Sequence, residues 1–262
     1  MSTMTTPPIP ADLTPLEIPG PVARVPSLDR LYELTAVPDR RVVFRGVDWA
    51  FYEELVDSIP ESTCIHVDYD GRDLEVTSIG REHEIAKKLM GRIAETAAEE
   101  LNIPYLPAGQ TTWKRPEISR GLEADECYFF LPKKLAADRA ALERHSKNIA
   151  DYPNPDLAIE VDISRPEVDR AGIYAALKVP EIWRLEGDQV IIERLTPQGT
   201  YASVDSSGFL PLRAEEIRHW VVEEDWRDFL GWLRRLRAEM KKKAQRLARA
   251  ERRRGEGKEG SA

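Results

Sequence analysis

Three acidic residues in the middle of the chain have the side-chain types and the spacing that metal-assisted chemistry requires. Glu160 and Asp162 alternate with apolar residues in the run 157–163. Because successive side chains of a β-strand point to opposite faces, the two acids are expected on one face, about 7 Å apart along the strand. Asp125 precedes a second apolar run, and it falls beside Glu160 if the two strands pair.

Carboxylates that converge at strand ends repel one another, so that one of them stays protonated unless a cation lies nearby. Mg²⁺ and Mn²⁺ remove this cost, and both ions prefer carboxylate, carbonyl and water oxygens. An ion held in this way polarises a phosphodiester and lowers the pKa of its bound water. By spacing alone, the alternative is a set of exposed acids on an edge strand.

The 262-residue chain has the composition of a globular protein, with 42% apolar and 32% charged residues. Its net charge of −8 is uneven: from Arg234 onward there are 12 Lys or Arg and 4 Asp or Glu residues, about +8, which leaves about −16 for the remainder. An acidic body repels phosphate unless cations intervene. No run approaches the ~18 apolar residues of a membrane span, and the N-terminus does not read as a secretory signal. Cys64 and Cys127 form no CxxC pair, so we expect a cytoplasmic protein with reduced thiols.

The chain is predicted to have three segments. Residues 1–40 carry seven prolines between Pro7 and Pro26, which fix φ and remove backbone donors. We therefore expect a disordered arm there, in which only Leu28–Leu34 packs onto the body. Residues 41–237 form the folded domain. Residues 238–262 form a basic tail, partly helical and partly disordered, which is either a solvated helix end or a surface for nucleic-acid backbone.

The folded domain alternates helical and strand patterns, which indicates an α/β fold. Asp48 can cap its first helix, and Asp70-Gly71 predicts a hairpin turn. The predicted elements, in chain order, are a helix at 47–59, a hairpin at 63–76, a helix at 81–101, strands at 110–114 and 122–130, a charged helix or flap at 132–150, a strand at 156–163, a helix at 168–177, a hairpin at 183–194 and helices from 214.

Three strings within this domain resemble one known family. They are residues 121–129 (GLEADECYF), 155–164 (PDLAIEVDIS) and 173–184 (IYAALKVPEIWR). Together they are similar to the Uma-two family of bacterial endonucleases, with similarity over roughly residues 42–237. The resemblance implies the restriction-endonuclease-like PD-(D/E)xK fold, in which helices flank a mixed central sheet. It also implies a metal-dependent endonuclease that hydrolyses phosphodiester bonds.

The resemblance assigns roles to individual residues. Asp125 would be the first metal ligand and Glu160 the second, with the carbonyl oxygen of Val161 as the third. His83 or Glu84, at the start of a helix, would orient water or the scissile phosphate. The implied cofactor is Mg²⁺ or Mn²⁺. The implied partner is nucleic acid, with DNA favoured, and two copies would pair if both strands are cut.

The chain departs from the family pattern at the third motif position, where Asp162 replaces the usual lysine and would assist the metal ion. That lysine would stabilise the pentavalent phosphate or help to deprotonate water. Arg170 or Lys114 could supply a displaced cation and contact nucleic acid, although an arginine acts only electrostatically. An active nuclease therefore competes with a fold that has lost catalysis and now binds or regulates. A basic side chain within about 6 Å of Glu160 favours the active enzyme. Asp156 is expected only to start a strand.

Overall fold

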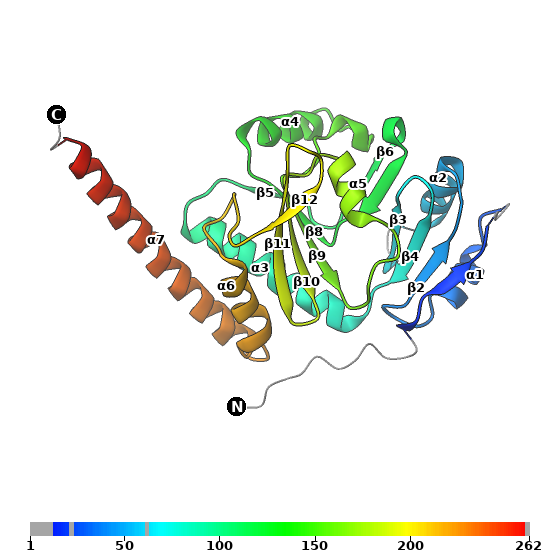
Figure 1. Cartoon of the computed structure of the whole chain (residues 1–262), viewed down its shortest axis with the longest axis horizontal. Helices are drawn as coiled ribbons and strands as arrows, with labels where there is room; N and C mark the ends of the chain where they lie inside the picture. The colour runs from blue at the N-terminus through cyan, green and yellow to red at the C-terminus, as the bar shows by residue number, and fades with distance from the viewer. Residues whose placement is uncertain (1–12, 21–23, 61–62, 260–262) are drawn as a thin grey trace.

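The computed structural model describes residues 13–20, 24–60 and 63–259, and it has an α/β architecture (Figure 1). The first half contains β1 (Leu16–Ile18), α1 (Leu28–Leu34), β2 (Arg41–Phe44), α2 (Trp49–Ser58), β3 (Ile65–Tyr69), β4 (Leu74–Ser78), α3 (Arg81–Glu100), β5 (Leu106–Pro107), β6 (Thr112–Arg115), the 3₁₀ turn η2 (Pro116–Ile118), β7 (Arg120–Glu123) and β8 (Glu126–Phe129). The second half contains α4 (Pro132–Glu143), the 3₁₀ turn η3 (Ile149–Asp151), β9 (Leu157–Asp162), α5 (Arg170–Ala176), β10 (Glu181–Glu186), β11 (Gln189–Leu195), β12 (Tyr201–Val204), α6 (Ala214–Arg218), the π-helical turn η4 (His219–Glu223) and α7 (Phe229–Glu259).

The described strands form two six-stranded mixed sheets, where the resemblance implied one central sheet. The first sheet has the order β1-β2-β4-β3-β7-β6, and the second has the order β12-β11-β10-β9-β8-β5. The pairs β1–β2 and β9–β10 are parallel, and the other neighbours are antiparallel. The predicted α/β class, with helices beside mixed sheets, is confirmed. The number of sheets is corrected from one to two.

The predicted strand at 122–130 is two strands, one in each sheet. β7 pairs with β3 and β6, β8 pairs with β5 and β9, and the chain crosses between the sheets at Ala124 and Asp125. The Asp125 side chain accepts a hydrogen bond from the Val161 backbone N–H at 2.7 Å. The Asp125 carboxylate thereby takes the place of a backbone carbonyl as the acceptor. The ladder of backbone hydrogen bonds between β8 and β9 ends at this point. The apolar pattern does not reveal this break because both strands are largely buried and nearly continuous in sequence.

Separate apolar clusters support the two sheets. The largest packs α3 and α7 against the second sheet and includes Ile93, Ile159 and Leu236. Another packs α1 and α2 against the first sheet and includes Leu31 and Tyr52. Burial of each such side chain contributes about 1.5–3 kcal/mol. Each sheet therefore has apolar support of its own, and charged groups gather where the two sheets meet.

The Pro-rich segment contains two regular elements. Residues 1–12 and 21–23 lie outside the described part of the chain, but β1 pairs in parallel with β2. Helix α1 begins at Leu28, is capped by the side chain of Ser27, and buries Leu31 and Leu34. The strand β1 was not expected in a disordered arm, and it forms because the prolines flank it and do not interrupt it. The predicted packing of residues 28–34 is confirmed.

The basic tail is the continuation of α7, which runs without a break across the predicted boundary at residue 238 and reaches Glu259. Part of this tail was expected to be disordered. An existing helix is extended at low cost, however, because each added residue gains a backbone hydrogen bond. Residues 260–262 lie outside the described chain. No helix within the described ranges is long and apolar enough to cross a bilayer.

The close approach of β7 to α2 generates a stability prediction. A Cβ atom at Gly121 would overlap the hydroxyl and ring of Tyr52, which is fully buried. We expect Gly121→Ala to lower the free energy of unfolding by about 1–3 kcal/mol, because the core must shift. Gly208→Ala is the matched control, since its nearest neighbour is the flexible end of Arg194 at 3.2 Å. Urea denaturation measures both variants, and equal losses would contradict the predicted overlap.

Candidate functional site

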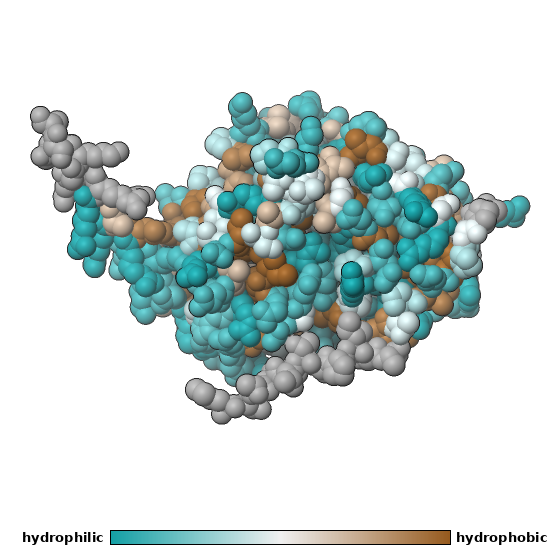
Figure 2. Space-filling view, in the orientation of Figure 1, coloured by the Kyte–Doolittle hydropathy of each residue, from teal (hydrophilic) through white to brown (hydrophobic). Residues whose placement is uncertain are grey.

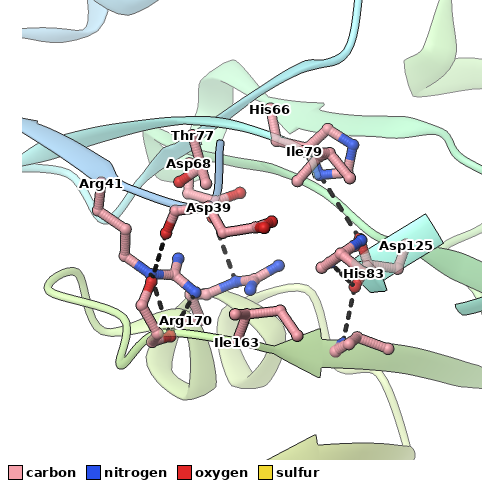
Figure 3. A pocket seen from close by; sticks show the side chains of 12 residues that line it. Asp39, Arg41, His66, Asp68, Thr77, Ile79, His83, Asp125, Ile163 and Arg170 are labelled. Atoms are coloured by element: carbon pink, nitrogen blue, oxygen red, sulfur yellow. Dashed lines mark hydrogen bonds and ion pairs between the residues drawn. The ribbon is translucent and has the colours of Figure 1, made fainter. Parts of the chain in front are cut away.

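A small cavity of about 20 Å³ lies where the two sheets meet (Figure 3). Asp125 and His83 line one side of it, and Arg41, Asp68 and Arg170 line the other. Each of these five residues is at most 6% exposed. A space of this size holds about one water molecule or one metal ion. The cavity is therefore a site for a single small group and does not enclose a nucleotide.

Asp125 lies at the crossover between the sheets and binds two donors through one carboxylate oxygen. Its Oδ2 accepts from the Val161 N–H at 2.7 Å and pairs with His83 Nε2 at 3.1 Å. Its Oδ1 is buried, accepts no hydrogen bond from any described residue and lies 3.6 Å from His66 Nδ1. Burial acts to raise the pKa of Asp125, but the His83 bond and the Arg170 charge hold that pKa below its usual value. Asp125 is thus an ionised acceptor with one open oxygen.

Gln110 determines which nitrogen of His66 carries the proton. Its amide oxygen accepts from Lys87 Nζ at 3.3 Å, and its amide nitrogen donates to Glu123 Oε1 at 2.5 Å. Because a lysine only donates and a carboxylate accepts, these contacts fix the orientation of the amide. The same nitrogen lies 2.6 Å from His66 Nε2, which must be the acceptor. Burial lowers the pKa of His66 to about 3, so the ring is neutral and its proton lies on Nδ1, toward Asp125.

Glu160 is bound by two residues of α5. Its Oε2 forms an ion pair with Arg170, and its Oε1 accepts a hydrogen bond from the Tyr174 hydroxyl. Arg170 and Tyr174 are four residues apart and therefore lie on one face of the helix. Burial raises the pKa of Glu160 well above its usual value; Arg170 opposes this shift, and the charges of Asp125 and Asp162 add to it. The Arg170 guanidinium satisfies the predicted condition that a basic side chain lies close to Glu160.

Asp162, at the position of the usual motif lysine, is surrounded by arginines. Its Oδ1 accepts from Arg41 at 3.0 Å and from Arg170 at 3.2 Å, and its Oδ2 lies 3.5 Å from Arg184 Nη1. These three arginines come from β2, α5 and β10. Asp162 therefore anchors guanidinium groups from three elements, and any part it takes in a metal site would compete with them.

The charged cluster around Arg170 has a surplus of negative charge. Arg170 Nε also pairs with Asp68 Oδ2 at 3.2 Å, and Arg41 pairs with Glu75. When all of its acids are ionised the cluster has a net charge of −2, and its Arg184 pairs with a further acid, Glu193, at 2.9 Å. Burial raises the pKa of Asp68 to about 6, as expected for a carboxylate that lacks enough positive charge nearby. The cluster consists of five carboxylates and three guanidinium groups, namely Asp68, Glu75, Asp125, Glu160, Asp162, Arg41, Arg170 and Arg184.

A divalent ion has the charge that would compensate this surplus. Mg²⁺ is usually held by one or two carboxylates together with water and substrate oxygens, so the open Oδ1 of Asp125 fits such an ion. The Val161 carbonyl points to the same side of β9 as its N–H, as a strand backbone requires. Glu160 fits less directly because both of its oxygens have partners. Within the described chain, no three His, Cys, Asp or Glu side chains are grouped as a complete metal site, so water or substrate would complete the shell.

Four of the predicted site residues are not part of the cavity wall. Glu160 and Asp162 pair with Arg170, which does line it, and the other two lie elsewhere. Glu84 is partly exposed on α3 and pairs with Lys87 at 2.6 Å. Lys114, on β6, pairs with Asp57 of α2 at 3.0 Å and is not part of the cavity wall. His83 is therefore the helix residue that reaches Asp125. Arg170 is the cation beside Glu160.

Four residues of the site were not predicted from the sequence. His66 and Asp68 alternate with apolar residues of β3, a pattern typical of a half-exposed strand, yet each is only 4% exposed. Arg41 precedes the region of resemblance, and Tyr174 lies within it but received no role from it. The alternation of polar and apolar residues in β3 was the available signal for His66 and Asp68. It does not show whether another element covers the polar face of the strand.

Two mixed sheets flanked by helices, joined by buried acids and arginines, define a restriction-endonuclease-like α/β protein. A family model, Uma2, described as "Putative restriction endonuclease", matches residues 49–219. The chain therefore belongs to the Uma2 (Uma-two) family, as its motifs predicted. Membership indicates nuclease function and a nucleic-acid substrate. No curated protein matches the sequence.

The raised pKa of Asp68 predicts a pH dependence. Its folded pKa, about 6, exceeds the unfolded value near 4, so the folded state binds more protons between these pH values. The contribution of Asp68 to the free energy of unfolding should therefore fall as pH rises through this window, by about 3 kcal/mol at most. We expect wild type to lose stability relative to Asp68→Asn from pH 4 to 7. Carbon-13 NMR of the carboxyl group gives the pKa directly, and titration below pH 4 would refute the assignment.

The Gln110 contacts predict the tautomer of His66. Nitrogen-15 NMR of the imidazole should show a protonated Nδ1 and an unprotonated Nε2 at pH 7, because Gln110 donates to Nε2. Gln110→Leu removes that donor and should give a mixture of tautomers. Gln189→Leu, at an exposed glutamine of β11, is the control and should leave the His66 signals unchanged. A protonated Nε2 in the wild-type protein would contradict the prediction.

Proposed function

We propose that the protein is a Mg²⁺- or Mn²⁺-dependent endonuclease that hydrolyses nucleic-acid phosphodiester bonds, with DNA as the favoured substrate. One observation carries this proposal: the open oxygen of Asp125 and the guanidinium of Arg170 belong to the same cavity. Phosphodiester hydrolysis needs a bound ion that activates water and positive charge that stabilises the developing phosphate charge. Asp125 and Arg170 supply the protein groups for these two tasks.

The residues around the cavity have distinct roles in this proposal. Asp125, with Glu160 and the Val161 carbonyl, would hold the ion. When bound, the ion supplies Lewis acidity and a water molecule of lowered pKa. His83 keeps Asp125 ionised and fixes its orientation through the 3.1 Å contact. Arg170 stays protonated at neutral pH, so it neutralises charge at Glu160 and at an incoming phosphate but takes no proton.

A binding or regulatory module without catalysis is the second candidate. It is favoured by the pairing of both Glu160 oxygens, since an ion at Glu160 would have to share these oxygens with Arg170 and Tyr174. The presence of Arg170 beside Glu160 favours the enzyme, because it restores a cation that Asp162 does not supply. Metal-dependent cleavage distinguishes the two candidates.

Cleavage of supercoiled plasmid in Mg²⁺ or Mn²⁺ tests the proposed activity. We expect Asp125→Asn and Glu160→Gln each to slow cleavage about 100-fold or more, the scale for losing one electrostatic contribution to the transition state. Asp57→Asn is the matched control, because Asp57 is an exposed acid paired with Lys114 outside the cavity. Calorimetry should likewise show Mn²⁺ binding that Asp125→Asn loses and Asp57→Asn keeps. Undiminished cleavage by Asp125→Asn would reject the site, whereas wild type that binds DNA without cutting it would support the second candidate.

A further inference from the structure

The distal half of α7 is a basic arm that projects from an acidic body. We define the arm as residues 241–253, which contain seven Lys or Arg residues and one Glu. The proximal half of α7 is fixed to the body: Trp232, Leu236 and Met240 are buried. Beyond this anchor the helix leads away from both sheets (Figure 1).

Ion pairs hold the base of the arm in place. Arg237 pairs with Glu99 and Glu100 of α3, at 2.8 and 3.2 Å. Lys243 pairs with Glu216 of α6 at 2.5 Å. These contacts lie on two helices of the body, so the direction in which the arm leaves the body is determined by packing and charge.

Six basic side chains of the arm lie on one face. At about 100° per residue they fall within an arc of about 140°, and they extend over about 18 Å along the helix. All six residues are exposed, and Figure 2 shows hydrophilic residues along α7 with apolar ones beside them. The apolar stripe of Leu236 and Met240 lies outside this arc, so the basic face is turned away from the anchor. The six residues are Lys241, Lys242, Arg246, Arg249, Arg252 and Arg253.

We propose that this face is a sequence-independent contact for the phosphate backbone of duplex nucleic acid. The charge of the molecule supports this partner: the arm is basic, while the chain as a whole has a net charge of −8. An acidic body repels a polyanion, and a basic face held away from it offers phosphates an attractive surface. The contact is a binding function in its own right, and it does not depend on the proposed cleavage.

Two other partners fit the arm less well. A second arm would bring like charges together, because Glu251 is the one acid among residues 241–253. A membrane surface requires large apolar side chains opposite the basic face. There the arm offers Ala244, Ala248, Ala250 and a single leucine, Leu247, with no aromatic residue. Nucleic-acid backbone, which needs charge but no apolar face, remains the best match.

Fluorescence anisotropy with a labelled 30-base-pair DNA duplex in EDTA tests the proposal without any contribution from cleavage. The test variant combines Arg249→Gln, Arg252→Gln and Arg253→Gln in the full-length protein, because glutamine preserves helix propensity. We expect affinity at low salt to fall about tenfold or more. We also expect the magnitude of the slope of log K against log salt concentration to decrease by about 3, because each lost phosphate contact lowers it by about one.

The matched control removes the same charge from the body through Lys133→Gln, Arg144→Gln and Lys147→Gln, at exposed positions on and just after α4. It should bind DNA within about twofold of wild type, and circular dichroism should show equal helix content in all three proteins. Binding that is unchanged in the arm variant, or weakened equally in the control, would overturn the proposal. Two further results would overturn it. One is a wild-type dimer in sedimentation that is absent in the arm variant. The other is binding of wild type and control to phosphatidylglycerol vesicles that the arm variant does not show.

Discussion

The structure depends on one buried guanidinium group. Arg170 pairs with Asp68 from the first sheet and with Glu160 and Asp162 from the second, and it is only 6% exposed. Removal of one partner from such a buried pair usually costs about 3–5 kcal/mol, because uncompensated charge remains in the interior. The relative position of the two sheets and the electrostatics of the cavity therefore have the same physical origin. This coupling explains why charged groups occupy a junction that apolar residues could have filled.

Helix α5 gives this guanidinium its direction. Asp169 caps the helix by accepting from the Gly172 N–H at 2.9 Å, so Arg170 is its first residue. Tyr174 follows one turn later on the same face and reaches the other oxygen of Glu160. A short helix thus determines how both oxygens of a strand carboxylate are bound. Whether Glu160 can bind an ion therefore depends on the position of α5 as well as on β9.

The sequence was sufficient for the elements and for part of the site. Alternation in β9 placed Glu160 and Asp162 on one face, and Asp156 has the structural role expected of it, since it accepts from the N–H groups of Phe130 and Leu131. It was not sufficient for His66 and Asp68, because a period of two separates the faces of a strand without showing which face another element covers. The break at Asp125 was also invisible, since it arises from a side-chain contact with β9 and not from a local turn signal.

The aspartate at position 162 changes how positive charge is supplied to this site. A lysine there would bring its own ammonium group on β9, and no distant partner would be needed. An aspartate instead adds negative charge beside Glu160, and the fold meets it with arginines from β2, α5 and β10. Since guanidinium groups stay protonated, these residues offer stable charge but no base. In the proposed reaction the arginines would therefore hold the carboxylates in place and neutralise charge, and they would leave proton removal from water to other groups.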